Sequence, residues 1–187
     1  IVLGTNTVGG LQITTTATNN IGLGANAVDS ITTGDYNVGL GDGALTANTT
    51  GSSNVAVGLD ALKANTTGDF NVASGAQALI ANTTADNNTA TGYQTMLSNT
   101  TGSGNTAYGS NALLVNSTAA NNTSVGYSSM RYNSTGANNT AVGKDSLYQN
   151  TTASNNTAVG MSALYANTTG ASNVAVGYNA LSTNTTG

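Results

Sequence analysis

A 17-residue repeat sets the architecture open to this chain. Asparagine recurs at every 17th position from Asn48 to Asn167, and whole phrases recur with it, such as Asn-Val-Ala-Val-Gly at 54–58 and 173–177. A fixed period is typical of folds that stack one structural unit, in which each unit contacts its neighbours. Helical repeats need units of about 30 residues or more, so this period favours a β architecture.

Each unit contains one segment with the pattern of a β-strand. Asn is followed by Val or Thr, a small residue, usually Val or Leu, and then Gly. β-branched residues at alternate positions predict a short strand. Four residues after the Gly comes Leu or Met, in a segment that fits either a second strand or a short turn. The unit closes with Asn-Thr-Thr-Gly, which is turn chemistry.

The sequence therefore predicts an all-β fold, a parallel β-solenoid with 17 residues per coil. So short a coil suggests a flattened β-roll of two strands and two turns. Residues 14–183 divide into ten units, residues 1–13 into a partial irregular coil with a longer connector, and residues 184–187 begin a further repeat. We expect about 11 coils at a spacing of about 4.8 Å, within a longer repeat protein.

Two orientations of the strand are open. If the small residue and the Gly face inward, a stripe of Val runs along the outside, and such a stripe marks an interface. Alternatively, residues such as Val57 and Leu62 share the interior and the chain stands alone. In both cases we expect Asn and Thr to stack on their counterparts in the next coil as hydrogen-bonded ladders.

The composition offers little chemistry for catalysis. The chain has no His, no Cys and no Glu, and its seven acidic residues are all Asp. Catalysis needs positioned acids, bases or nucleophiles, so we predict that the protein is not an enzyme and binds no cofactor or metal. Three basic residues are too few for a nucleic-acid partner, and no apolar run is long enough for membrane insertion.

Two polar patterns each allow a purely structural and a functional interpretation. Asp-x-Asn at 35–37, 69–71 and 86–88 is a weak hint of a calcium site, and a solvated turn is the favoured explanation. Asn-x-Ser/Thr triplets begin at positions that include Asn48, Asn65, Asn82, Asn99 and Asn167. They match the N-glycosylation pattern, but the repeat generates them automatically, so they are either bare or decorated as a row.

Tyrosines at variable positions are the candidate surface-binding residues. Tyr93, Tyr127 and Tyr178 directly follow the Gly that recurs in every repeat, whereas Tyr148 and Tyr165 stack in another column. Neighbouring variable positions hold Lys63, Arg131 and Lys144. Variable residues on a rigid scaffold are where binding surfaces arise, and Tyr is common in them. The alternative is ordinary surface variation.

The repeat also resembles a known family. Asn-Thr-Ala-Val-Gly at 139–143 and 156–160, with Tyr-x-Ala-Leu and Asn-Thr-Thr-Gly at 178–187, resembles repeats of bacteriophage tail-fibre and related surface-fibre proteins that carry a C-terminal intramolecular-chaperone domain. This resemblance covers nearly the whole chain. More distantly, Asn-Val-Ala-Val-Gly is similar to the Ser-Val-Ala-Ile-Gly phrase in the heads of YadA-type trimeric autotransporter adhesins, which use a shorter unit.

The resemblance implies a homotrimer of left-handed parallel β-rolls with their Val-bearing faces toward a common axis. It implies a structural shaft or stalk of an extracellular, cell-surface or virion fibre that presents a distal receptor-binding tip. Two alternatives stay open. The segment is an adhesin module that binds a cell-surface receptor, host glycans or other surfaces through its variable columns, or it is a self-assembling filament subunit.

Overall fold

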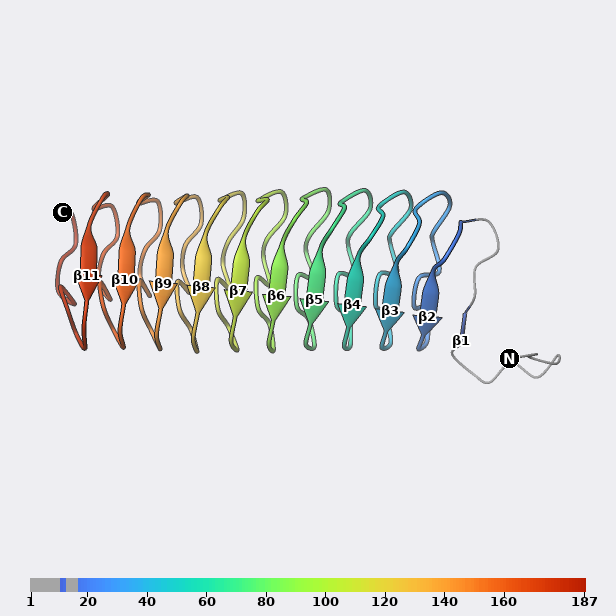
Figure 1. The fold of residues 1–187 in the computed structure, drawn as a ribbon, viewed down its shortest axis with the longest axis horizontal. Helices are drawn as coiled ribbons and strands as arrows, with labels where there is room; N and C mark the ends of the chain where they lie inside the picture. Colours follow the sequence, from blue (N-terminus) through green and yellow to red (C-terminus); the bar gives the residue numbers. More distant parts are fainter. Residues whose placement is uncertain (1–10, 13–16) are drawn as a thin grey trace.

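The computed structural model describes residues 11–12 and 17–187, which form a stack of β coils (Figure 1). This part of the chain contains no helix. The strands are β1 Leu11–Gln12, β2 Ile21–Leu23, β3 Val38–Leu40, β4 Val55–Val57, β5 Val72–Ser74, β6 Thr89–Thr91, β7 Thr106–Tyr108, β8 Thr123–Val125, β9 Thr140–Val142, β10 Thr157–Val159 and β11 Val174–Val176.

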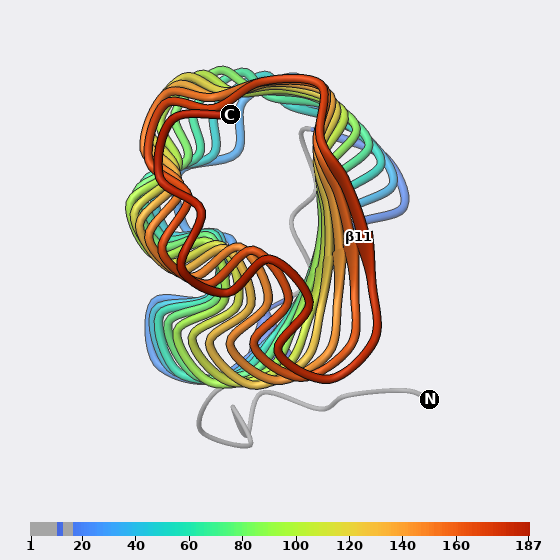
Figure 2. The same cartoon turned by 90° about the vertical axis from the view of Figure 1, so that its left-hand side faces the viewer.

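The strands form one sheet in which the order along the chain is also the order in space. From β2 to β11 each strand pairs in parallel with the next at a shift of 17 residues, so that Ala56, for example, lies opposite Ala73. This confirms the parallel β-solenoid and its 17-residue coil. Viewed along the stack, the coils overlie one another with all the strands on one side (Figure 2).

The N-terminal end differs from the prediction. The partial coil expected over residues 1–13 lies mostly outside the described residues. Within the described part, β1 pairs antiparallel with β2, with Leu11 opposite Leu23. Leu11 and Gln12 therefore lie across the edge of β2 rather than adding a parallel strand to the stack.

Each coil of the described stack contains one strand, not the two expected for a flattened roll. The segment after the Gly is a turn, because its Leu or Met adopts a left-handed backbone, with φ of 51° at Leu62 and 52° at Leu79. An extended strand cannot contain such a residue. The coils still hydrogen-bond to each other there, and Leu62 N donates to Ala78 O at 3.0 Å.

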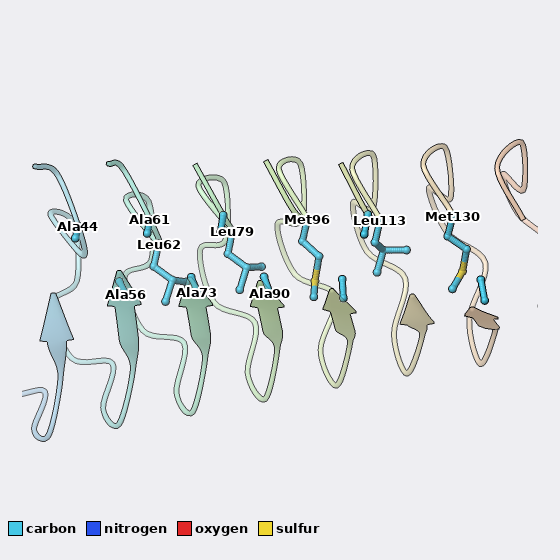
Figure 3. Close-up of a cluster of buried hydrophobic side chains, with 14 of the residues drawn as sticks. Ala44, Ala56, Ala61, Leu62, Ala73, Leu79, Ala90, Met96, Leu113 and Met130 are labelled. Atoms are coloured by element: carbon cyan, nitrogen blue, oxygen red, sulfur yellow. The ribbon is translucent and has the colours of Figure 1, made fainter. Parts of the chain in front are cut away.

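The core is a narrow layer between the strands and this turn (Figure 3). The middle residue of each strand, such as Ala56 or Ala73, is fully buried, and Leu62 and Leu79 reach across from the turn to meet this alanine layer. The Leu side chains fill the space, which leaves room for only a methyl group on the strand. Val57 is 38% exposed on the outside. The alternative that Val57 and Leu62 share the interior is therefore wrong.

Two internal ladders of asparagine close the rest of the coil, as predicted. In the first, Asn65 Nδ2 donates to Asn48 Oδ1 of the preceding coil at 2.9 Å. In the second, Asn54 N and Nδ2 donate to Asn37 Oδ1 at 3.0 and 3.2 Å. The carbonyl of Gly68 accepts an amide from each ladder, from Asn65 at 3.0 Å and from Asn54 at 2.8 Å. The ladders are thereby linked across the coil.

The threonines behave differently from the asparagines. The first Thr of each Asn-Thr-Thr turn bonds the backbone of the next coil rather than another hydroxyl, as when Thr49 Oγ1 donates to Thr66 O at 3.1 Å. The second Thr, such as Thr50, is exposed. The expected Thr ladder is therefore a row of hydroxyl-to-carbonyl hydrogen bonds.

The Gly at the end of each strand cannot be replaced without strain. Gly109 has φ of 130°, and a Cβ on it would lie 2.6 Å from Gly126 O. Successive coils thus approach so closely at this corner that only hydrogen atoms fit between them, in a conformation that L residues rarely adopt.

We expect Gly109→Ala to lower the free energy of unfolding by about 2–5 kcal/mol, because it combines a left-handed φ with overpacking. Gly104→Asn is the control, because Gly104 has φ of 71° and the equivalent residue of the next coil, Asn121, has φ of 59°. This control should change stability by less than about 0.5 kcal/mol. Urea denaturation followed by circular dichroism measures both, and equal losses would contradict the crowding argument.

We expect Asn82→Ala to lower the free energy of unfolding by about 3 kcal/mol, because it removes buried hydrogen bonds and leaves their partners unsatisfied. Asn82 Nδ2 donates to Asn65 Oδ1 at 2.8 Å, and Asn82 Oδ1 accepts from Asn99 Nδ2 at 3.0 Å. Thr84→Ala, at an exposed position of the same coil, should be nearly neutral. Thermal unfolding of the two variants would show no difference if the ladder contributes nothing to stability.

Candidate functional site

The outer side of the sheet is an uncharged stripe that runs the length of the described stack. We call it the sheet face and define it as the first and third residues of β2 to β11. These residues are Ile21, Leu23, Val38, Leu40, Val55, Val57, Val72, Ser74, Thr89, Thr91, Thr106, Tyr108, Thr123, Val125, Thr140, Val142, Thr157, Val159, Val174 and Val176. The sheet face is aliphatic toward both ends and rich in Thr in its middle. Exposed aliphatic side chains gathered on one face of a protein often mark an interface.

Three of the predicted tyrosines lie beside the sheet face. Tyr93, Tyr127 and Tyr178 follow the strand-ending Gly and are 53%, 53% and 71% exposed. Tyr93 and Tyr127 are two coils apart, or about 10 Å at the usual strand spacing. Tyr108, in the coil between them, is 61% exposed on the sheet face itself. The column after the Gly therefore presents separate tyrosines rather than one cluster.

The other two predicted tyrosines do form a cluster. The rings of Tyr148 and Tyr165 stack with their centroids 5.0 Å apart and their planes 3° apart, which confirms that this column stacks. Tyr132 joins them edge-on, with its centroid 5.2 Å from that of Tyr148 and an interplanar angle of 86°. Sequence reasoning missed Tyr132 because it occupies the next column. Its position beside Arg131, one coil before Tyr148, is the signal that could have found it.

Arg131 completes this cluster and differs from the two lysines. Its guanidinium carbon lies 5.7 Å from the centre of the Tyr132 ring, within the range of a cation–π contact. Lys63 pairs with Asp60 at 3.0 Å and Lys144 with Asp145 at 3.7 Å. Within residues 17–187 Arg131 makes no such ion pair, and its buried Nε has no hydrogen-bond partner.

The cluster also affects the ionisation of one tyrosine. Burial raises the pKa of Tyr148 above its ordinary value, and the neighbouring Tyr132 raises it further, while Arg131 opposes both. The Tyr148 hydroxyl therefore remains protonated at neutral pH and is a hydrogen-bond donor there. A side-chain hydrogen bond between Tyr132 and Tyr148 is one cause of this shift, so the two hydroxyl groups lie close together.

The Asp-x-Asn pattern does not assemble a calcium site in the described residues. The Asn of each pattern, such as Asn71, points into the core ladder. The Asp bonds the backbone of the preceding coil instead, and Asp69 Oδ1 accepts from Ser52 N at 2.7 Å. The Asn side chain thus points into the coil and the Asp side chain bonds the preceding coil, so the two do not converge on one site. Residues 11–12 and 17–187 contain no group of three or more His, Cys, Asp or Glu side chains that could hold a metal ion.

The glycosylation triplets named above begin at buried asparagines. Asn48, Asn65, Asn82, Asn99 and Asn167 are all fully buried members of the first ladder. Their amide nitrogens donate hydrogen bonds inside the coil, as Asn167 Nδ2 does to Gly170 O at 2.9 Å. A glycan on any of these nitrogens is incompatible with the folded coil, so a decorated row at these positions does not fit the structure.

No family model, curated protein or solved structure matches the chain. In the described part of the chain, no helix has the length and apolar character required to cross a bilayer.

Proposed function

We propose that this segment is a structural shaft of an extracellular, cell-surface or virion fibre that presents a distal receptor-binding tip. The main support for this proposal is the unbroken register of the strands from β2, at one end of the stack, to β11, at the other (Figure 1). Each coil adds a fixed rise of about 4.8 Å, so the reach of such a shaft is set by the number of its repeats. A spacer requires this property, and it needs no catalytic group.

Stiffness follows from how each coil bonds the next. Between the coils of β4 and β5, hydrogen bonds join the strand, the turn and the core ladder, as in Val55 N to Asn71 O at 2.8 Å, Leu62 N to Ala78 O at 3.0 Å and Asn71 Nδ2 to Asn54 Oδ1 at 3.2 Å. Bending would have to stretch one of these sets of bonds. Stability is therefore distributed along the interfaces of a quasi-one-dimensional stack.

We further propose that the shaft is a homotrimer whose sheet faces meet at a shared axis. The sheet face contains no charged residue, and Val142 and Val159 remain 36% and 37% exposed in the single chain. Covering this surface would bury its exposed aliphatic side chains, which is favourable at roughly 25 cal/mol per Å² of apolar area. The resemblance of the repeats to fibre proteins agrees with this arrangement.

Light scattering should give residues 1–187 a mass of three 18.3 kDa chains. A double variant, Val142→Glu with Val159→Glu, should be monomeric, because it places charges in an apolar interface. Thr152→Glu, at an exposed turn position outside the sheet face, should remain trimeric. A wild-type chain that is folded by circular dichroism but has the mass of one chain would overturn the trimer.

The second candidate is an adhesin module, which the exposed Tyr93, Tyr108 and Tyr127 favour because Tyr is a frequent contact residue in binding surfaces. The self-assembling filament is less well supported. An open sheet edge is what templates head-to-tail contacts, and β1 pairs with the β2 edge at the N-terminal end of the described stack.

Deleting residues 89–122, two whole units, separates the shaft from the adhesin. The deletion joins Asn88 to Thr123 in phase and removes Tyr93 and Tyr108. In the intact fibre we expect the shaft to shorten by about 10 Å, measured by electron microscopy of averaged particles, with attachment to the target surface retained. Loss of attachment, with the fold preserved, would favour the adhesin. Deletion of residues 38–71, two units without these tyrosines, is the control.

A further inference from the structure

The cluster of Arg131, Tyr132, Tyr148 and Tyr165 lies outside the apolar core. Its members come from three successive coils and lie in the segment that follows the core Leu or Met of each unit. The core Leu or Met that precedes this segment, such as Leu113 or Met130, lies across the core from the strands (Figure 3). The cluster is therefore separate from the sheet face, and it does not depend on the proposed trimer.

We propose that this cluster is a binding site for a carboxylate-bearing saccharide. The guanidinium of Arg131 pairs with the carboxylate, and the tyrosines contact the sugar ring and its hydroxyl groups. The ligand class is a pyranose that carries an acid group, such as a sialic acid or a uronic acid residue of a surface polysaccharide.

The charge of Arg131 points to an anionic ligand. The chain carries seven acidic and three basic residues, and both lysines are paired with an Asp of their own coil. Arg131 is the one basic residue of the described chain without such a partner. Its planar guanidinium presents donors in a fork that matches a carboxylate, and a charge-assisted pair of this kind is stronger than a neutral hydrogen bond.

The tyrosines supply the contacts that a sugar needs. Tyr132 is 41% exposed and offers apolar ring surface beside the guanidinium. Tyr148 and Tyr165 cover one face of each other, which holds both rings in place. A phenolic hydroxyl group is both a donor and an acceptor, so the hydroxyl groups of the three tyrosines can donate to and accept from sugar hydroxyls. Rings fixed in this way bind at little cost in conformational entropy.

Packing alone does not require these residues. The position of Arg131 is occupied by Leu97 and Leu114 in the two preceding coils, and by Lys63 four coils earlier. The position of Tyr165 is occupied by Ser182 in the following coil. The same backbone therefore accepts an aliphatic, a basic or a small residue there, and the run of Arg and Tyr in three adjacent coils is a local departure from the repeat.

The chain contains a single arginine, so the Nε–H group of Arg131 gives one unambiguous cross-peak in a ¹H–¹⁵N spectrum of the labelled protein. We would titrate residues 1–187 with 3′-sialyllactose, with trigalacturonic acid and with lactose as the neutral control. We expect a saturable shift of this cross-peak with one or both acidic saccharides and none with lactose. A response to only one of them identifies the acid. No shift with either acid, or an equal shift with lactose, would overturn the proposal.

Variants test the same site by calorimetry with the acid that responds. Arg131→Leu, which copies Leu114, should weaken binding about tenfold or more, because it removes the charge-assisted pair. Lys63→Leu is the matched control at the same position of another coil and should bind like the wild type. Tyr165→Ser, which copies Ser182, should weaken binding without changing the charge. Equal losses of affinity in the Arg131 and Lys63 variants would mean that net charge alone explains the binding, and would overturn the site. If Arg131→Leu does not fold, Arg131→Lys takes its place.

Discussion

The fold depends on asparagine amides that hydrogen-bond from coil to coil inside the stack. A coil with an alanine layer on one side and a single Leu or Met on the other buries too little apolar surface to enclose its own backbone. The amide supplies both a donor and an acceptor, so Asn65 can donate to Asn48 while it accepts from Asn82. The same amides hold the carbonyl of the Asn-Thr-Thr-Gly turn. The interior is therefore partly polar, and every coil needs a neighbour of the same sequence to satisfy it.

The period and the composition of each column were enough to predict the stack, its register and the asparagine ladders. Identical residues 17 positions apart must face one another once the coils are in phase, whatever the detailed path of the backbone. The path itself was less predictable. Leu62 is buried in a left-handed conformation that an L residue adopts only when its surroundings enforce it, so the segment was open to interpretation as a strand. The direction of Val57 was likewise undecided, because alternation alone gives two equivalent faces.

On the surface, too, contacts within one column were easier to predict than contacts between columns. Tyr148 and Tyr165 share a column, and their stacking could be predicted from the sequence. Tyr132 belongs to the adjacent column, and its contact with Tyr148 depends on the shape of the turn, which no pattern of spacing reveals. The ion pairs of Lys63 and Lys144 are local, with Asp60 and Asp145, whereas Arg131 has no acidic residue that close in the sequence. A repeat thus predicts relations along the axis better than relations around the coil.

The strict in-phase register of β2 to β11 has a consequence for how such a protein changes over generations. Nearly identical units encoded in tandem are substrates for unequal recombination, which adds or removes whole repeats. Because every coil presents the same ladders at its upper and lower edges, a chain that gains or loses a unit rejoins without a mismatch. The reach of the stack can therefore change by whole repeats with the fold preserved, while substitutions confined to one coil, such as those at Arg131 and Tyr132, alter the surface locally.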